Sequence, residues 1–152
     1  MSEPDPSNNP AAPYDVVVVG GGPAGLQAAL TLGRMHRRVL LLDSGEYRNA
    51  PAEHMHNFVT HDGTPPAEFR AAARAELAAY ATVTVRETAA SAVVPDCAGF
   101  RVELGAEAGG AASFTDRAVV LATGMRDTLP AIPGLEPLFG TVAAVCPYCQ
   151  VL

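Results

Sequence analysis

The chain has 152 residues, which is enough for one domain with its own hydrophobic core and too few for two full domains. Hydrophobic residues make up 49% of the sequence and charged residues 17%, a composition typical of a buried α/β core rather than a disordered chain. A net charge of −6 without any run of Lys or Arg argues against nucleic acid and membranes as partners.

The first thirteen residues, MSEPDPSNNPAAP, are rich in proline and polar or acidic side chains. They lack the cationic start and apolar centre of a signal peptide, and no apolar run approaches the roughly 18 residues of a membrane span. We therefore expect residues 1–13 to be a disordered tail on a cytoplasmic protein. In such a protein a Cys-x-x-Cys pair is redox-active or binds metal, and the separate Cys97 is expected to be an incidental thiol.

A strand, a glycine turn, a helix and a second strand follow in order. Tyr14–Val19 (YDVVVV) is a continuous β-branched run, as expected for a strand buried on both faces. GGGPAG comes next, followed by LQAALTLGRMH, which has a helical period. Arg37–Asp43 (RRVLLLD) then predicts a second buried strand that ends in an acid. The pattern is a βαβ unit of about thirty residues.

The rest of the chain mixes loops with short β-rich segments. Ser44–Gly63 is irregular and polar, and Thr64-Pro65-Pro66 predicts the start of a helix from Ala67 to about Ala81. TVTVRE, SAVV and FRVEL predict a β-meander, and Ala118–Ala122 predicts another buried strand. The expected fold class is therefore α/β, a Rossmann-like βαβ domain with a parallel sheet and a β-meander insertion.

The glycine turn has the spacing of a dinucleotide site. Gly20 permits a tight turn, Gly22 lets the backbone approach a pyrophosphate, and Gly25 lets helix and strand pack closely. Asp43, at the end of the second strand, is placed to accept hydrogen bonds from an adenosine ribose. The turn therefore predicts a ligand with an ADP moiety, and the spacing does not choose between FAD and NAD.

Three ordered motifs resemble one family. GGGPAGLQAAL resembles the FAD-binding start of the thioredoxin-reductase-like pyridine nucleotide-disulfide oxidoreductases, and RAVVLATGMRDTLPAIPG is similar to their second flavin motif. CPYC matches their redox pair, and EYRNAPAEHMHNFVTHDGTPPAEF is similar to a bacterial branch in which this segment lies along the flavin. The cofactor-binding residues implied by the resemblance are Gly20, Gly22, Pro23, Ala24, Gly25, Asp43, Ser44, Arg48, Asn49, His56, Asn57, Asp62, Thr123 and Gly124.

Cys146 and Cys149 are the catalytic candidates. A zinc site would need a second ligand pair that the spacing does not offer, and a glutaredoxin fold would need most of its domain after the motif. The resemblance implies that electrons pass from NAD(P)H through FAD to a Cys146–Cys149 disulfide. Cys149 would then face the flavin, and Cys146 would attack a substrate disulfide. Gln150 departs from the acid or His that the family carries there, and it can supply neither proton role.

In the family, an NAD(P)H-binding domain and a returning C-terminal segment follow the cysteines. We therefore expect 14–125 to be the N-terminal part of an FAD-binding domain, and 126–152 to be a linker and the start of a missing NAD(P)H domain. The 152 residues would then be a partial or inactive fragment. The expected partner is a disulfide or dithiol substrate, either a small protein or a small molecule, with no metal; a homodimer is compatible with the resemblance. Two alternatives stay open: a flavin-dependent dithiol oxidase that uses oxygen, and a non-catalytic FAD- or ADP-binding module.

Overall fold

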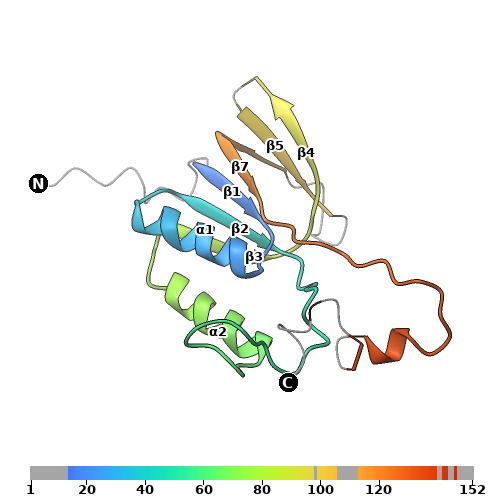
Figure 1. Ribbon diagram of the computed structural model, residues 1–152. Helices are drawn as coiled ribbons and strands as arrows, with labels where there is room; N and C mark the ends of the chain where they lie inside the picture. The colour runs from blue at the N-terminus through green and yellow to red at the C-terminus, as the bar shows by residue number, and fades with distance from the viewer. Residues whose placement is uncertain (1–13, 98, 106–112, 140–141, 144–145, 147–152) are drawn as a thin grey trace, which may run out of the picture. The chain divides into compact units, whose positions relative to one another are not determined.

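The computed structural model describes residues 14–97, 99–105, 113–139, 142–143 and 146 (Figure 1). These residues group into two compact units, each built from two separate stretches of the chain. The first unit contains the described residues up to Gly45 together with Ala73–Thr123. The second contains Glu46–Ala72 and the described residues from Gly124 onward.

A four-stranded parallel sheet forms the centre of the first unit. Its strands are β1 (Val16–Val19), β2 (Val39–Asp43), β3 (Val83–Glu87) and β7 (Ala118–Leu121), in the order β3-β2-β1-β7. All five residues of β2 are buried, as expected for an inner strand of a parallel sheet that is covered on both faces. Side chains of a strand alternate between the two faces of the sheet, so the residues of β2 contribute to the hydrophobic core on each face.

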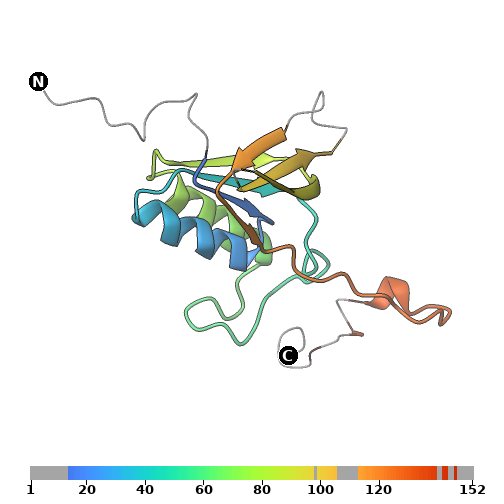
Figure 2. The ribbon, with the colours of Figure 1, turned by 90° about the horizontal axis from the view of Figure 1, so that it is seen from above.

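Helices cover one face of the sheet. Helix α1 (Pro23–Arg34) and the C-terminal half of α2 (Pro66–Leu77) pack there, as Figure 2 shows. Pro23 occupies the first helical position of α1, where the missing N–H is not needed for a helical hydrogen bond. The core on this face is made by Val18, Leu26, Ala29, Val39, Leu41 and Leu77.

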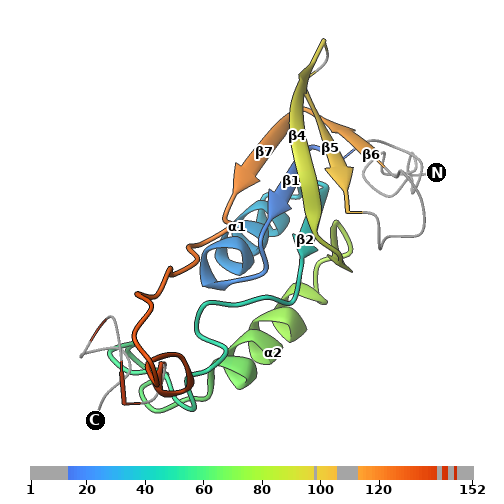
Figure 3. The same cartoon turned by 90° about the vertical axis from the view of Figure 1, so that its right-hand side faces the viewer.

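An antiparallel meander covers the opposite face (Figure 3). It consists of β4 (Ala90–Asp96), β5 (Gly99–Leu104) and β6 (Ser113–Asp116), in the order β4-β5-β6. Val102 and Leu104 point from β5 onto Val17, Leu40 and Leu42 of the parallel sheet. The α/β class, the parallel sheet and the inserted meander are as predicted from the sequence.

The meander differs from the predicted one in its strands. TVTVRE was predicted as its first strand, but β3 pairs in parallel with β2, and the third strand of the meander is β6. Val83 and Val85 face the helices, whereas Thr84 is exposed. An edge strand buried on one face alternates in the same way as a strand of a meander, so the hydrophobic pattern could not separate the two.

Two further boundaries differ from the prediction. Helix α2 ends at Leu77 rather than near Ala81, although Tyr80 still lies against Gly33 of α1. Strand β7 is the edge of the parallel sheet and is not buried on both faces; Leu121 is 68% exposed. In the described part of the chain, no helix is long and apolar enough to cross a membrane.

Candidate functional site

The glycine turn between β1 and α1 is closely packed on one side. Gly20 has φ +115°, a conformation that residues with a Cβ rarely adopt, and its N–H donates to the Leu42 carbonyl at 2.8 Å. A Cβ at Gly20 would overlap the Ala122 carbonyl oxygen, and a Cβ at Gly25 would overlap the Gly20 carbonyl oxygen. Both glycines therefore have the packing roles that the motif predicts.

Gly22 lies on the open side of the same turn. A Cβ built there would meet no described atom within 4 Å, and φ of −77° is an ordinary backbone angle. Gly22 is the N-cap of α1, and the first turn of this helix contains no acidic residue. Because the first N–H groups of a helix lack helical partners and carry partial positive charge, the turn suits an anion that touches the backbone. A dinucleotide pyrophosphate fits this cradle, and a side chain at Gly22 would fill it.

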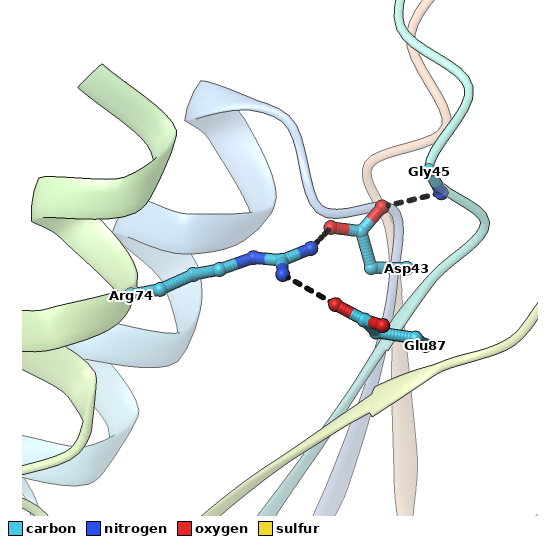
Figure 4. A network of polar contacts seen from close by, with 4 residues as sticks. All are labelled: Asp43, Gly45, Arg74 and Glu87. Carbon is cyan, nitrogen blue, oxygen red and sulfur yellow. Dashed lines mark hydrogen bonds and ion pairs between the residues drawn. The ribbon is translucent and has the colours of Figure 1, made fainter. Parts of the chain in front are cut away.

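Asp43 lies beside this turn and is only 1% exposed. Its Oδ1 accepts the Gly45 N–H at 3.0 Å, and its Oδ2 pairs with Nη2 of Arg74 from α2 (Figure 4). The other terminal nitrogen of Arg74, Nη1, donates to Oε1 of Glu87 at 2.8 Å. A Cβ on Gly21 would overlap the Asp43 carboxylate, so Gly21 permits the acid to lie against the turn.

The motif did not identify Gly21, Arg74 or Glu87. Only Glu87 carried a signal, since it ends a strand as an acid in the way that Asp43 does. Arg74 reaches Asp43 from 31 residues further along the chain, and only the fold brings the two together.

In the second unit, Arg48 and Asp127 form a two-bonded ion pair. Nε and Nη2 of Arg48 donate to the two Asp127 oxygens at 2.7 and 2.9 Å. This hydrogen bonding lowers the pKa of Asp127 below its usual value and raises the pKa of Arg48. Nη2 of the adjacent Arg126 lies 2.6 Å from Oε2 of Glu46. Two ion pairs thus join the segment that holds Arg48 to the residues directly after the Ala-Thr-Gly motif.

Asn49 is held by a residue of α2. Nη1 of Arg70 donates to the Asn49 side-chain oxygen at 3.2 Å, and the Arg70 guanidinium carbon lies 3.7 Å from the centre of the Tyr47 ring. Cation–π stacking of this kind fixes the guanidinium plane. The predicted flavin-segment residues Arg48 and Asn49 therefore both have ordered side-chain partners within the second unit.

His56, Asn57 and Asp62 occur together in one loop of that unit. The Asn57 N–H donates to Asp62 Oδ1 at 2.8 Å, and His56 Nδ1 lies 3.5 Å from the same oxygen. Asn57 has φ of 60°, which Asn tolerates better than most residues do. The loop thus brings three of the predicted residues into one polar cluster.

The remaining predicted residues are exposed, apart from Cys146 and those that lie outside the described part. Pro23, Ala24, Ser44, Thr123 and Gly124 are exposed. Cys146 is half-buried and disulfide-bonded, whereas Cys149 and Gln150 are outside the described residues. Among the residues described, no group of His, Cys, Asp and Glu side chains could hold a metal ion.

The chain matches known proteins over nearly its whole length. It is 40% identical to thioredoxin reductase aclD of Aspergillus oryzae, covering 92% of this chain and 44% of that protein. It is 37% identical to thioredoxin reductase tcpT of Claviceps purpurea, covering 90% of this chain and 42% of that protein. The crystal structure of an oxidoreductase from Agrobacterium tumefaciens superposes with a TM-score of 0.85 at 39% identity, covering 91% of this chain and 46% of that one.

These matches also show how much of each relative's length the chain covers. The chain spans less than half the length of the curated relatives it matches, 36–44% for three of them. The family model for pyridine nucleotide-disulphide oxidoreductases matches residues 14–152. The chain is therefore a member of the pyridine nucleotide-disulphide oxidoreductase family, and an oxidoreductase by that membership.

Proposed function

We propose that this chain binds FAD at the glycine turn and carries the redox-active cysteines of an NAD(P)H-dependent disulfide oxidoreductase similar to thioredoxin reductase. The observation that carries the proposal is the open backbone at Gly22, at the N-terminus of α1 and at the carboxyl edge of a parallel sheet. Ligands of open α/β sheets bind at this edge. The names of the relatives support the disulfide chemistry.

Bound FAD would relay two electrons between NAD(P)H and a disulfide. The residues of the chain would hold it in place. The N-terminal N–H groups of α1 would donate to the pyrophosphate, and the packed pair Gly20 and Gly25 would fix the turn that presents them. We propose a cofactor-binding role also for Arg48, Asn49 and His56, and for Thr123 and Gly124, as the resemblance of their motifs implies. We also propose that 14–125 supplies the FAD-binding part, and that 126–152 is a linker and the start of an NAD(P)H-binding part.

The proposed reaction of the cysteines conserves electrons. The thiolate of Cys146 attacks a substrate disulfide, forms a mixed disulfide and releases one substrate thiolate. The thiolate of Cys149 then attacks the Cys146 sulfur, so the second substrate thiol leaves and the Cys146–Cys149 disulfide forms again. Two electrons have moved from the pair to the substrate. The Gln150 amide cannot exchange the protons, which therefore pass to solvent or to another group.

Flavin retention tests the proposal directly. The 152-residue chain is incubated with FAD and desalted, and bound flavin is measured by its visible absorbance against protein concentration. About one flavin per chain is expected, since the described residues contain one glycine turn with this geometry. Retention of NAD instead of FAD, or of neither, would refute the assignment to a flavoprotein.

The redox pair is tested by counting thiols. The chain has three cysteines, and Cys97 is exposed and free. Full reduction should therefore expose three titratable thiols, and mild oxidation should leave one. Cys97→Ser, the matched control, should still lose two thiols on oxidation, whereas Cys146→Ser should not. A two-thiol loss that needs Cys97, or thiol protection by added zinc that a chelator reverses, would contradict a redox pair at the CPYC motif.

A further inference from the structure

Asp43 and Glu87 are the last residues of the neighbouring strands β2 and β3, and their side chains differ sharply in exposure. The two residues are paired in the parallel register of these strands. The Asp43 side chain is 1% exposed, and the Glu87 side chain is 80% exposed. The acid chosen by the dinucleotide motif is thus covered by protein, whereas the acid one strand further along faces solvent.

Contacts within the first unit account for the burial of Asp43. Its carboxylate accepts from the Gly45 N–H, pairs with Arg74 and lies against the Gly21 backbone. A buried carboxylate needs such partners, because an unpaired charge away from water is costly. These contacts leave only 1% of the Asp43 side chain exposed, so its carboxylate is covered by protein.

Arg74 connects the two acids. The guanidinium is planar, and each of its two terminal nitrogens holds a different carboxylate, one of Asp43 and one of Glu87. Asp43 therefore anchors Arg74 from the buried side, and Arg74 orients the exposed Glu87 carboxylate. A carboxylate offers about four acceptor positions, so Glu87 can accept from Arg74 and still accept from a ligand.

The position of Glu87 suits the adenosine end of a dinucleotide. Gly20, Asp43 and Glu87 follow or end the three neighbouring strands β1, β2 and β3. Adjacent strands lie about 4.8 Å apart, so Glu87 is roughly 10 Å along the sheet edge from the turn. A nucleotide with its phosphates on the turn would extend its ribose along this edge.

We propose that Glu87, oriented by Arg74, accepts the hydrogen bonds of the adenosine ribose hydroxyls, and that Asp43 is the buried anchor of Arg74 rather than the ribose acceptor. This inference rests on the proposed dinucleotide site. Glu87 is then the specificity-determining residue for the ribose, and Arg74 is a positioning residue.

The test compares ADP with 2′,3′-dideoxy-ADP, which lacks both ribose hydroxyls, by calorimetric titration of the 152-residue chain. The unmodified chain is expected to bind ADP about tenfold more tightly than the dideoxy nucleotide. Glu87→Gln should reduce this ratio to about two or less. Glu76→Gln, which removes another exposed acid of the same unit, should leave the ratio unchanged. Because the ratio compares two ligands on one protein, a general loosening of the fold does not alter it.

Asp43→Asn separates the two acids. This variant should lower the thermal unfolding midpoint, because it weakens the anchor of Arg74. It should reduce the ratio less than Glu87→Gln does, because Nη1 of Arg74 can still donate to the Glu87 carboxylate. A ratio that collapses in Asp43→Asn and persists in Glu87→Gln would overturn the inference. Equal binding of the two nucleotides by the unmodified chain would also overturn it, while the proposed FAD site would stand. If the unmodified chain binds neither ADP nor FAD, the proposed function fails as well. Should Asp43→Asn not fold, the exposed Glu87→Gln and Glu76→Gln variants still decide.

Discussion

Replacing Gly22 with Val is expected to weaken FAD binding on the order of 100-fold, with little change in the thermal unfolding midpoint. A Cβ at Gly22 meets no described atom within 4 Å, so the folded chain can accept the larger side chain. The isopropyl group would occupy the space through which a pyrophosphate reaches the backbone N–H groups. Hydrogen bonds to a charged group contribute about 1.5–3 kcal/mol each, and loss of two of them corresponds to a factor on the order of 100 or more.

The measurement is a titration of FAD against each variant, with the unfolding midpoint recorded in parallel. Gly22→Ala should have an intermediate effect on affinity. Gly25→Ala is the structural contrast: its Cβ would overlap the Gly20 carbonyl oxygen, so this variant should lose stability before any effect on binding can be read. If Gly22→Val chains retain a full complement of flavin after desalting, the pyrophosphate does not lie on this turn.

The sequence was sufficient to predict the parts of the fold that depend on local signals. The βαβ unit has two such signals. Its strands Val16–Val19 and Val39–Asp43 are runs of mainly apolar residues, and the turn between the first strand and the helix has glycines at the spacing typical of a βαβ unit. The packing of Gly20 and Gly25 in the structure agrees with the roles that their spacing indicates. The match to the family model over residues 14–152 confirms the family that the motifs indicated.

The pairing of the strands was harder to predict from the sequence than the positions of the strands along the chain. The segment at β3 alternates apolar and polar residues, which fits a meander strand and equally fits the one-sided edge of a parallel sheet. The choice between them depends on pairing with β2, and β2 lies about forty residues earlier in the chain. No local pattern carries that information.

Side-chain partners in the candidate site were beyond prediction for the same reason. Arg74 reaches Asp43 across 31 positions, and Arg48 reaches Asp127 across 79. The motif identified Asp43 as an acid at the end of a strand, but it could not show that Arg74 would cover the carboxylate. Burial and long-range pairing are properties of the fold, and they change which residue of a motif is available to a ligand.

The first unit contains a second buried acid, whose charge should make stability depend on pH. Asp116, the last residue of β6, is 2% exposed, and neither carboxylate oxygen has a hydrogen-bond partner among the described residues. Burial raises its pKa from the ordinary 3.8 to about 6. The folded chain therefore binds this proton more tightly than the unfolded chain does. As the pH rises from about 4 to about 6, Asp116 should lower the free energy of unfolding by up to about 3 kcal/mol, and the loss should then level off.

Asp116→Asn removes the charge at nearly constant volume, so it should stabilise the chain above pH 6 and abolish this part of the pH dependence. At pH 7.5 the expected gain in unfolding free energy is about 2 kcal/mol, less than the full 3 kcal/mol because a buried amide also loses hydration. Urea unfolding of both chains between pH 4 and pH 8 measures the difference in unfolding free energy against pH. This difference curve should be near zero at pH 4 and largest above pH 6.

Asp96→Asn is the matched control in the same meander. Asp96 is exposed, and the Cys97 N–H that donates to it lowers its pKa, so removing its charge should give no gain in unfolding free energy. A difference curve for Asp116→Asn that is flat across this range would show that the carboxyl is paired or solvated in solution. The charged Asp116 carboxylate would then not lower the free energy of unfolding.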